Sequence, residues 1–146
     1  MDNIVLETII NAKLAICDDY DIKTYISIMN GAFDFMSQDE IGILLGNLFD
    51  NAIEASKNSK KKSIELQGWK DGKYTLLLMK NSIDETVLGK NKTLMTTKSD
   101  KNNHGYGIKS INRIVNNYNG YIEYYEKKGY FVSYIYMQRE KNTVRP

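Results

Sequence analysis

The stretch from Leu44 to Asn58 reads Leu-Leu-Gly-Asn-Leu-Phe-Asp-Asn-Ala-Ile-Glu-Ala-Ser-Lys-Asn. At about 100° per residue, a helix over this stretch gathers polar side chains into one narrow arc, with Asp50 beside it. The arc consists of Asn47, Asn51, Glu54 and Asn58. The rest of the circumference is apolar, which is wider than the stripe of an ordinary surface helix. We therefore expect a helix that is buried on most sides, with its polar arc facing an enclosed cavity.

Two asparagines one turn apart suit a metal-bound nucleotide. Buried amides need partners to offset their desolvation, and an amide oxygen can coordinate Mg²⁺ without adding negative charge beside a triphosphate. The alternative is a solvated helix face, which is the commoner fate of polar residues at helical spacing. Against it, no lysine or arginine occurs between Glu40 and Lys57. The periodicity alone leaves both interpretations open.

Composition predicts one domain, residues 1–146. The 42% hydrophobic content suffices for a core, and a net charge of +2 gives no global field that would favour nucleic acid or an anionic membrane. A single cysteine, Cys17, excludes an internal disulfide and fits a reducing compartment. The apolar runs are too short to cross a bilayer, and no signal peptide is recognisable. We expect a cytoplasmic chain that does not insert into the membrane.

The residues before the central stretch predict one helix and one strand. Residues 4–16 have helical spacing, with an expected apolar face of Ile4, Val5, Ile9, Ala12 and Ile16. Alternation over 22–28 predicts a half-buried strand, and Asn30-Gly31 marks a turn. Ser37-Gln-Asp-Glu40 is a capping box that starts the central helix.

The second half predicts two hairpins on either side of a long polar segment. Residues 63–69 and 73–80 are rich in β-formers and flank a turn containing Gly72. Residues 82–104 have no sustained period, and connections this long are usually functional, so we interpret them as a lid, with a tolerated surface insertion as the alternative. Strands over 121–125 and 131–137 make an aromatic hairpin, followed by a polar tail, 138–146.

A second candidate site element lies where this polar segment ends. Gly105-Tyr106-Gly107 precedes a predicted helix, and glycines there let the backbone approach a ligand, while the helix N-terminus offers unpaired N–H groups to phosphate. Glycines that only permit a turn are the alternative. Asn119-Gly120 is expected to end this helix, with Gly120 in the left-handed conformation.

Asn47-Leu-Phe-Asp-Asn-Ala-Ile-Glu-Ala55 resembles the N-box of the GHKL ATP-binding domains, and most closely that of sensor histidine kinases. The gyrase, mismatch-repair and chaperone ATPases of that superfamily carry a water-activating glutamate four residues before the magnesium-binding asparagine. Here that position is Asn47. Residues 98–120 resemble the glycine box of Agr-type quorum-sensing kinases. Asn81-Ser82 replaces the usual Asp-x-Gly-x-Gly, as is common in that branch, and Asn81 would then recognise the adenine edge.

The resemblance implies an α/β fold of Bergerat type: a two-layer α/β sandwich with a mixed sheet of about five strands under three helices. It implies a protein-histidine kinase domain that binds Mg-ATP and donates the γ-phosphoryl group to a histidine on a separate helical dimerisation domain. That acceptor is not in this chain, so the chain alone would be inactive in transfer. A response regulator would act downstream, and this segment would form the cytoplasmic part of a membrane-bound sensor. The implied ATP-binding residues, with Asn51 and Asn47 at Mg²⁺, are Asn47, Asn51, Glu54, Asn81, Lys98, His104, Gly105, Tyr106, Gly107 and Ile108.

Two alternatives share these motifs. An anti-sigma-factor kinase of the same fold would phosphorylate a serine on a partner protein, but the His104-Gly-Tyr-Gly-Ile form and the Asn81-Ser82 pair favour the sensor-kinase branch. A non-catalytic nucleotide-binding module would act by changing shape. The only histidine, His104, is interpreted as a lid-hinge or phosphate-side residue, with a plain loop histidine as the alternative.

Overall fold

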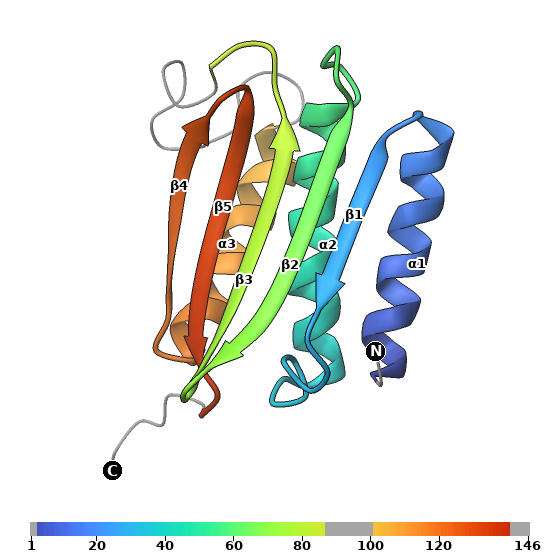
Figure 1. The fold of residues 1–146 in the computed structure, drawn as a ribbon. Helices are drawn as coiled ribbons and strands as arrows, with labels where there is room; N and C mark the ends of the chain where they lie inside the picture. The colour runs from blue at the N-terminus through green and yellow to red at the C-terminus, as the bar shows by residue number, and fades with distance from the viewer. Residues whose placement is uncertain (1–2, 87–100, 141–146) are drawn as a thin grey trace.

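The computed structural model describes residues 3–86 and 101–140, with residues 101–106 described by their helical backbone alone. This part of the chain forms three helices and five strands (Figure 1). In chain order they are α1 (Ile4–Asp19), β1 (Lys23–Ile28), α2 (Gln38–Ser56), β2 (Ser63–Asp71), β3 (Tyr74–Ser82), α3 (Lys101–Asn117), β4 (Tyr121–Lys127) and β5 (Tyr130–Gln138).

The strands form a single mixed sheet in the order β1-β2-β3-β5-β4. β1 runs parallel to β2, and the remaining neighbours are antiparallel. Figure 1 shows the helices gathered on one side of the sheet, with α2 and α3 behind its central strands. This arrangement confirms the predicted two-layer α/β sandwich, and it places β3 at the centre of the sheet.

The central helix α2 forms where the capping box predicts. Ser37 Oγ accepts a hydrogen bond from Glu40 N at 3.1 Å, and Glu40 Oε1 accepts one from Ser37 N at 2.9 Å. The Tyr118 hydroxyl, just beyond α3, donates to the same Glu40 carboxylate. This ties the end of α3 to the start of α2. The predicted apolar surface of α2 is confirmed, since its buried residues include Ile41, Leu44, Leu45, Leu48, Phe49, Ala52 and Ile53.

The expected apolar face of α1 is only partly correct, since Val5 and Ile9 are partly buried and pack against the core but the other three residues do not. Ile4 is 77% exposed, and Ala12 and Ile16 are also exposed. The face that the protein buries is centred instead on Leu6, Ile10 and Cys17. The helix carries more apolar residues than one stripe holds, and α1 packs on α2 and the β1 edge alone. The contacts of α1 with α2 and β1 therefore determine which of its apolar stripes is buried, and the periodicity of the sequence does not reveal these contacts.

Cys17 is fully buried in the core. Burial, and then the nearby Asp18 carboxylate, raise the pKa of the Cys17 thiol to about 11.

The core residues of the sheet come from alternate positions of its strands, such as Leu66, Leu77 and Ile135. Among the described residues, no helix combines the length and hydrophobicity that a bilayer span requires.

Three boundaries differ from the sequence predictions. β3 includes Ser82 and α3 begins at Lys101, so both ends of the expected loop 82–104 lie in regular structure, and Gly105 and Gly107 lie inside the helix rather than before it. Glycine inside a helix costs only about 1 kcal/mol relative to alanine, which its neighbours can offset. Residues 87–100 of the expected lid lie outside the described residues. The expected polar tail, 138–146, begins too early: Gln138 N donates to Tyr118 O at 2.8 Å, and residues 141–146 are outside the description.

The end of α3 corrects the expectation for Gly120. Asn119 has a φ of 51°, while Gly120 does not have a positive φ. Asn119 N donates to Asn116 O and Gly120 N donates to Val115 O, which is a Schellman motif with asparagine in the left-handed position. Gly120 is required for a different reason: a Cβ there would lie 2.0 Å from Tyr136 O. The missing side chain lets this corner approach β5.

We expect Gly120→Ala to lower the free energy of unfolding by about 1–3 kcal/mol, because the methyl group would collide with backbone that cannot rotate away. The matched control is Gly46→Ala in α2, where a Cβ meets nothing within 4 Å. This control should be neutral or stabilising by up to about 1 kcal/mol. Urea denaturation measures both, and equal stabilities for the two variants would contradict the proposed close approach.

Candidate functional site

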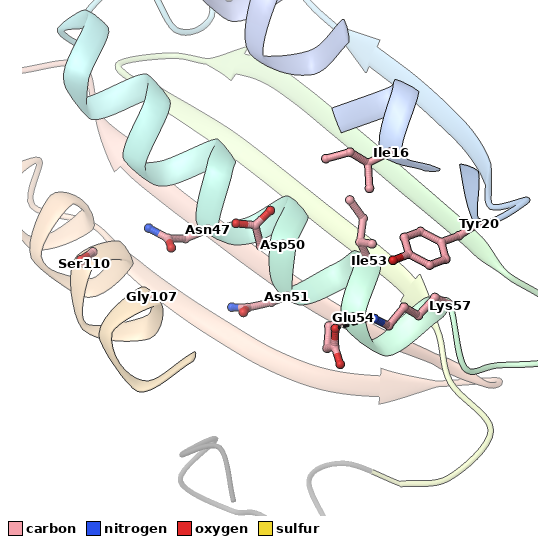
Figure 2. Close-up of a pocket in the computed structure, with 10 residues that line it drawn as sticks. All are labelled: Ile16, Tyr20, Asn47, Asp50, Asn51, Ile53, Glu54, Lys57, Gly107 and Ser110. Atoms are coloured by element: carbon pink, nitrogen blue, oxygen red, sulfur yellow. Dashed lines mark ion pairs between the residues drawn. The ribbon is translucent and has the colours of Figure 1, made fainter. Parts of the chain in front are cut away.

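A hollow of about 540 Å³ lies between the three helices (Figure 2). Its walls come from the end of α1, from one face of α2 and from the first described side chains of α3. The lining residues are Ile16, Tyr20, Asn47, Asp50, Asn51, Ile53, Glu54, Lys57, Gly107 and Ser110. Three members of the predicted polar arc are thus brought to one pocket. The fourth, Asn58, is exposed and is not among the described residues that line it, so the expectation of one enclosed arc is only partly correct.

Asn47 lies at the contact between α2 and α3. Its amide nitrogen donates to Ile43 O, one turn back, at 2.8 Å. The amide oxygen is the atom nearest to Gly107, where an added Cβ would lie only 3.0 Å away. Glycine at 107 therefore allows the two helices to approach at this point, a packing role that the sequence does not reveal. Figure 2 shows the Asn47 side chain directed toward α3.

Asn51 lies one turn further along and extends in the same direction (Figure 2). The residue is half-buried. No other described residue forms a hydrogen bond with its side chain. Its amide can therefore bind a ligand without first breaking a bond within the described part of the protein.

The two carboxylates that line the pocket are each matched by a lysine. Asp50 Oδ1 lies 2.7 Å from Lys13 Nζ on α1, and Glu54 Oε2 lies 3.0 Å from Lys57 Nζ. Lys57 Nζ also lies 5.2 Å from the centroid of the Tyr20 ring. The asparagine side of the pocket is therefore neutral, while the charged groups on the α1 side occur as pairs.

Asn81 lies near the end of β3 and is 4% exposed. Its strand position alternates with Lys80 and matches Leu77 and Met79, so it belongs to the helix-covered face of the sheet. Its amide nitrogen donates to Ser82 O at 3.3 Å. Asn81 is not among the described residues that line the hollow. The structure thus places it beneath the helices rather than on the pocket wall.

A buried serine cluster holds this end of β3 in place. Ser82 Oγ accepts a hydrogen bond from Ser63 N at 2.9 Å, and it lies 3.0 Å from Ser56 Oγ and 2.7 Å from Ser59 Oγ. The cluster joins the last turn of α2, the first residue of β2 and the residue beside Asn81. Sequence reasoning missed it, because serines at a helix end and in a loop resemble ordinary solvated positions.

Four of the remaining predicted site residues, His104, Gly105, Tyr106 and Ile108, belong to α3. Ile108 is half-buried but is not among the described lining residues. His104, Gly105 and Tyr106 have helical backbone in α3, and their side chains lie outside the description; Lys98 is outside it altogether. Sequence reasoning also missed five of the lining residues: Ile16, Tyr20, Ile53, Lys57 and Ser110. The i, i+4 spacing of Ile16 and Tyr20 at the end of α1 was the available signal.

Among the described residues, no group of three or more His, Cys, Asp or Glu side chains is arranged to hold a metal ion. The amide and carboxylate oxygens that line this pocket belong to the amides of Asn47 and Asn51 and to the carboxylates of Asp50 and Glu54. Both kinds of oxygen suit Mg²⁺, which commonly takes few protein ligands and completes its shell with phosphates and water.

Solved histidine kinase structures share this fold. The catalytic domain of histidine kinase ThkA superimposes with a TM-score of 0.73 at 15% identity, covering 92% of this chain and 90% of that one. Acinetobacter baumannii histidine kinase AdeS gives 0.64 at 16% identity, covering 92% and 63%. Full-length ShkA in complex with AMPPNP gives 0.68 at 10% identity, covering 91% and 29%. The architecture is therefore that of a histidine kinase catalytic domain.

The family model described as the GHKL domain matches residues 36–138, from just before α2 to the end of β5. This match covers well over half of the 146 residues, so the chain belongs to the GHKL family. No curated protein sequence matches it significantly.

The serine cluster generates a prediction about stability. Ser82→Ala should lower the free energy of unfolding by about 1–3 kcal/mol, because the buried Ser63 N–H would lose its acceptor. Ser27→Ala is the control, since Ser27 is exposed on β1, and it should change stability by less than about 0.5 kcal/mol. Chemical denaturation compares them, and a Ser82 variant as stable as its control would show that the cluster is not structural.

Proposed function

We propose that this chain binds Mg-ATP in the hollow between α2 and α3 and acts as the catalytic domain of a sensor histidine kinase, most like the Agr-type branch. The observation that carries the proposal is the pair Asn47 and Asn51, which project from one face of α2 into a pocket completed by Gly107 of α3. Membership of the GHKL family supports it, as does the shared fold with histidine kinase catalytic domains.

The donor set fits a magnesium ion. Asn51 has an amide with no hydrogen-bond partner among the described residues, and Asn47 has its nitrogen tied to Ile43 O, which leaves its oxygen for other contacts. Neither adds negative charge where a triphosphate would lie. When bound, Mg²⁺ would neutralise phosphate charge, which is a large part of phosphoryl-transfer catalysis. The protein's part is to position the nucleotide.

The other end of the nucleotide is assigned to β3. Asn81 lies on the covered face of the sheet with a side chain that can both donate and accept, which suits the adenine edge directly or through water. The serine cluster fixes its backbone. Lys98, His104, Gly105, Tyr106 and Ile108 are assigned to the phosphate side, and Glu54 to the pocket wall, on the resemblance of the glycine box and the N-box.

The pocket has no general base at position 47 to activate a water molecule. Asn47 stands where the hydrolytic GHKL enzymes carry a glutamate, and an amide cannot accept a proton from water at neutral pH. Asp50 and Glu54 are the carboxylates that line the hollow, and each faces a lysine at 2.7 Å and 3.0 Å. Their side chains are 58% and 40% exposed and keep contact with solvent, so the lack of water activation is assigned to Asn47 and not to these pairs. The bound γ-phosphoryl group is thus kept for another acceptor.

That acceptor is a histidine on a helical dimerisation domain. Its imidazole nitrogen attacks the γ-phosphorus, the bond to the bridging oxygen breaks, and ADP leaves. A response regulator would then receive the phosphoryl group. The chain spans 63% of the AdeS chain and 29% of full-length ShkA, so these solved kinases contain further segments. We propose the cytoplasm as its compartment, because its nucleotide substrate is there.

The metal assignment predicts the behaviour of Asn51→Ala. Removing one oxygen ligand should weaken Mg-ATP binding about tenfold to a hundredfold, the effect of losing one charge-assisted contact. Binding without magnesium should change little. Titration calorimetry with and without Mg²⁺ measures both affinities. Asn58→Ala is the control from the same helical arc, since Asn58 is exposed. Wild-type affinity in the Asn51 variant would remove this residue from the metal site.

The acceptor assignment predicts slow hydrolysis and transfer in trans. With γ-labelled ATP, the chain alone should release phosphate slowly and remain unlabelled, while an added cognate dimerisation domain should gain label on its histidine. Its His→Ala form is the control. Asn47→Glu should raise phosphate release by about 10²–10⁴, the usual value of general-base help. Rapid release by the wild type with no transfer would indicate an ATPase instead.

A further inference from the structure

The face of the sheet opposite the helices carries a hollow of about 600 Å³. Figure 1 shows this face toward the viewer, with α2 and α3 behind it. An open sheet face usually carries polar side chains, but tyrosine rings and carboxylates make up most of this lining. The lining residues are Asp71, Tyr74, Leu76, Glu123, Tyr125, Tyr134 and Tyr136. Among the described residues, no lysine or arginine lines the hollow.

The rings in and around the hollow pack on one another. The centroid of the Tyr136 ring lies 6.1 Å from that of Tyr134 and 6.4 Å from that of Tyr74. The Trp69 ring lies 6.2 Å from Tyr134. These contacts are edge-to-face, which is a favoured arrangement of aromatic rings. The rings therefore hold one another in place, and a ligand would not have to order them.

The strand register divides the hollow into two half-sites. Asp71 on β2 pairs with Tyr74 on β3, and Glu123 on β4 pairs with Tyr134 on β5. Residues paired in this way lie on the same face of the sheet. On β5, the residue level with Tyr74 is Gln138, which is four positions beyond Tyr134. With β3 and β5 between β2 and β4, the backbone positions of the two carboxylates are roughly 20 Å apart.

Neither carboxylate forms an ion pair with a described residue. The ion pairs among the described residues use other carboxylates, those of Asp50, Glu54 and Glu65. Two cations lie near Asp71: Lys73 Nζ is 5.6 Å from the Tyr74 ring centroid, and the Arg139 guanidinium donates to backbone oxygens of the turn between β2 and β3. The half-site of Glu123 and Tyr134 is therefore the more acidic one.

The negative potential extends over the hollow, but not over the whole face. Burial, and then the neighbouring tyrosines and the Glu123 and Asp71 carboxylates, raise the pKa of the Tyr134 hydroxyl. The adjacent hollow on the same face has Glu65 as its single carboxylate and is otherwise charged by Lys80, Lys127 and Lys128. A cationic ligand would be repelled by these lysines. It should therefore extend across the strands, between the two half-sites, rather than along them.

We propose that this hollow binds an extended segment of another protein through two arginine side chains, one beside Glu123 and one beside Asp71. The face of a tyrosine ring attracts a cation, and a carboxylate next to the ring accepts hydrogen bonds from it. Arginine suits these half-sites better than lysine, because its planar guanidinium stacks on rings, is weakly hydrated and binds carboxylates with two N–H groups. Arginines six positions apart in an extended segment are separated by about 20 Å, which matches the half-sites.

This inference does not rest on the proposed kinase activity. The pocket that contains Asn47 and Asn51 is built by helices, which lie on the other side of the sheet. Binding of a basic segment and binding of a nucleotide should therefore be independent.

NMR titration of the isotope-labelled 146-residue chain tests the proposal. The probe is a capped peptide with arginine at its first and seventh positions and glycine and serine between them. Backbone signals of β3, β4 and β5 should shift as the peptide is added, while those of α2 should not. High salt should weaken this binding, because both half-sites are exposed to solvent.

Two matched peptides test the chemistry of the ligand. Lysine in place of both arginines should raise the dissociation constant about threefold, because the ammonium group neither stacks nor forks. Citrulline keeps the shape of arginine without its charge, so the citrulline peptide should not bind measurably.

Matched variants of the chain test the half-sites. Glu123→Gln should raise the dissociation constant of the arginine peptide about fivefold, and Asp71→Asn about twofold, since Asp71 already lies near cations of the chain. Tyr134→Leu should raise it about threefold, whereas Tyr134→Phe keeps the ring and should bind like the wild type. Asp39→Asn is the control, because exposed Asp39 lies in the first turn of α2, and it should leave the affinity unchanged.

Three results would overturn the proposal. The first is the absence of shifts around the hollow at millimolar arginine peptide. The second is equal affinity for the arginine and lysine peptides, which would indicate attraction between charges alone. The third is wild-type affinity in the Glu123→Gln variant, an exposed and isosteric change that leaves the fold intact.

Discussion

The close contact between Asn47 and Gly107 is the constraint on which the pocket depends. Helix α2 must be covered on most sides, because its apolar residues wrap more than half of its surface, and α3 supplies one of the covering layers. A Cβ at position 107 would lie 3.0 Å from the Asn47 oxygen, so any larger residue there would require the Asn47 side chain to shift. The close approach of the two helices also brings the Asn51 amide beside the start of α3. The absence of a side chain at position 107 thus serves both the packing of α3 on α2 and the proposed binding of a ligand in the pocket.

The covered face and the open face of the sheet carry different kinds of side chain. The covered face positions Asn81 through buried serines and supports the helices that carry the asparagines. The open face carries tyrosines and charged side chains. A two-layer sandwich makes this separation natural, because only one side of the sheet is needed to build the core.

Local signals in the sequence predicted the elements well. The Ser37 capping box, the width of the α2 apolar surface and the two hairpins all follow from interactions within a few residues. The failures depend on contacts distant in sequence. Periodicity could not choose between the two stripes of α1, and nothing near Gly120 indicated that it faces Tyr136 O. The serine cluster joins positions as far apart as Ser56 and Ser82, and the sequence gives no sign that they meet.

The central claim is that the α2 amides lie beside the metal of a bound nucleotide. Titrating the isotope-labelled chain with Mn²⁺ and ATP, and following the side-chain amide signals by NMR, tests it directly, because the paramagnetic ion broadens the signals of nearby nuclei. The account predicts that the Asn51 and Asn47 signals broaden first, while that of exposed Asn58 persists longer. Sharp Asn51 and Asn47 signals at saturating Mn-ATP, with broadening centred elsewhere, would contradict it.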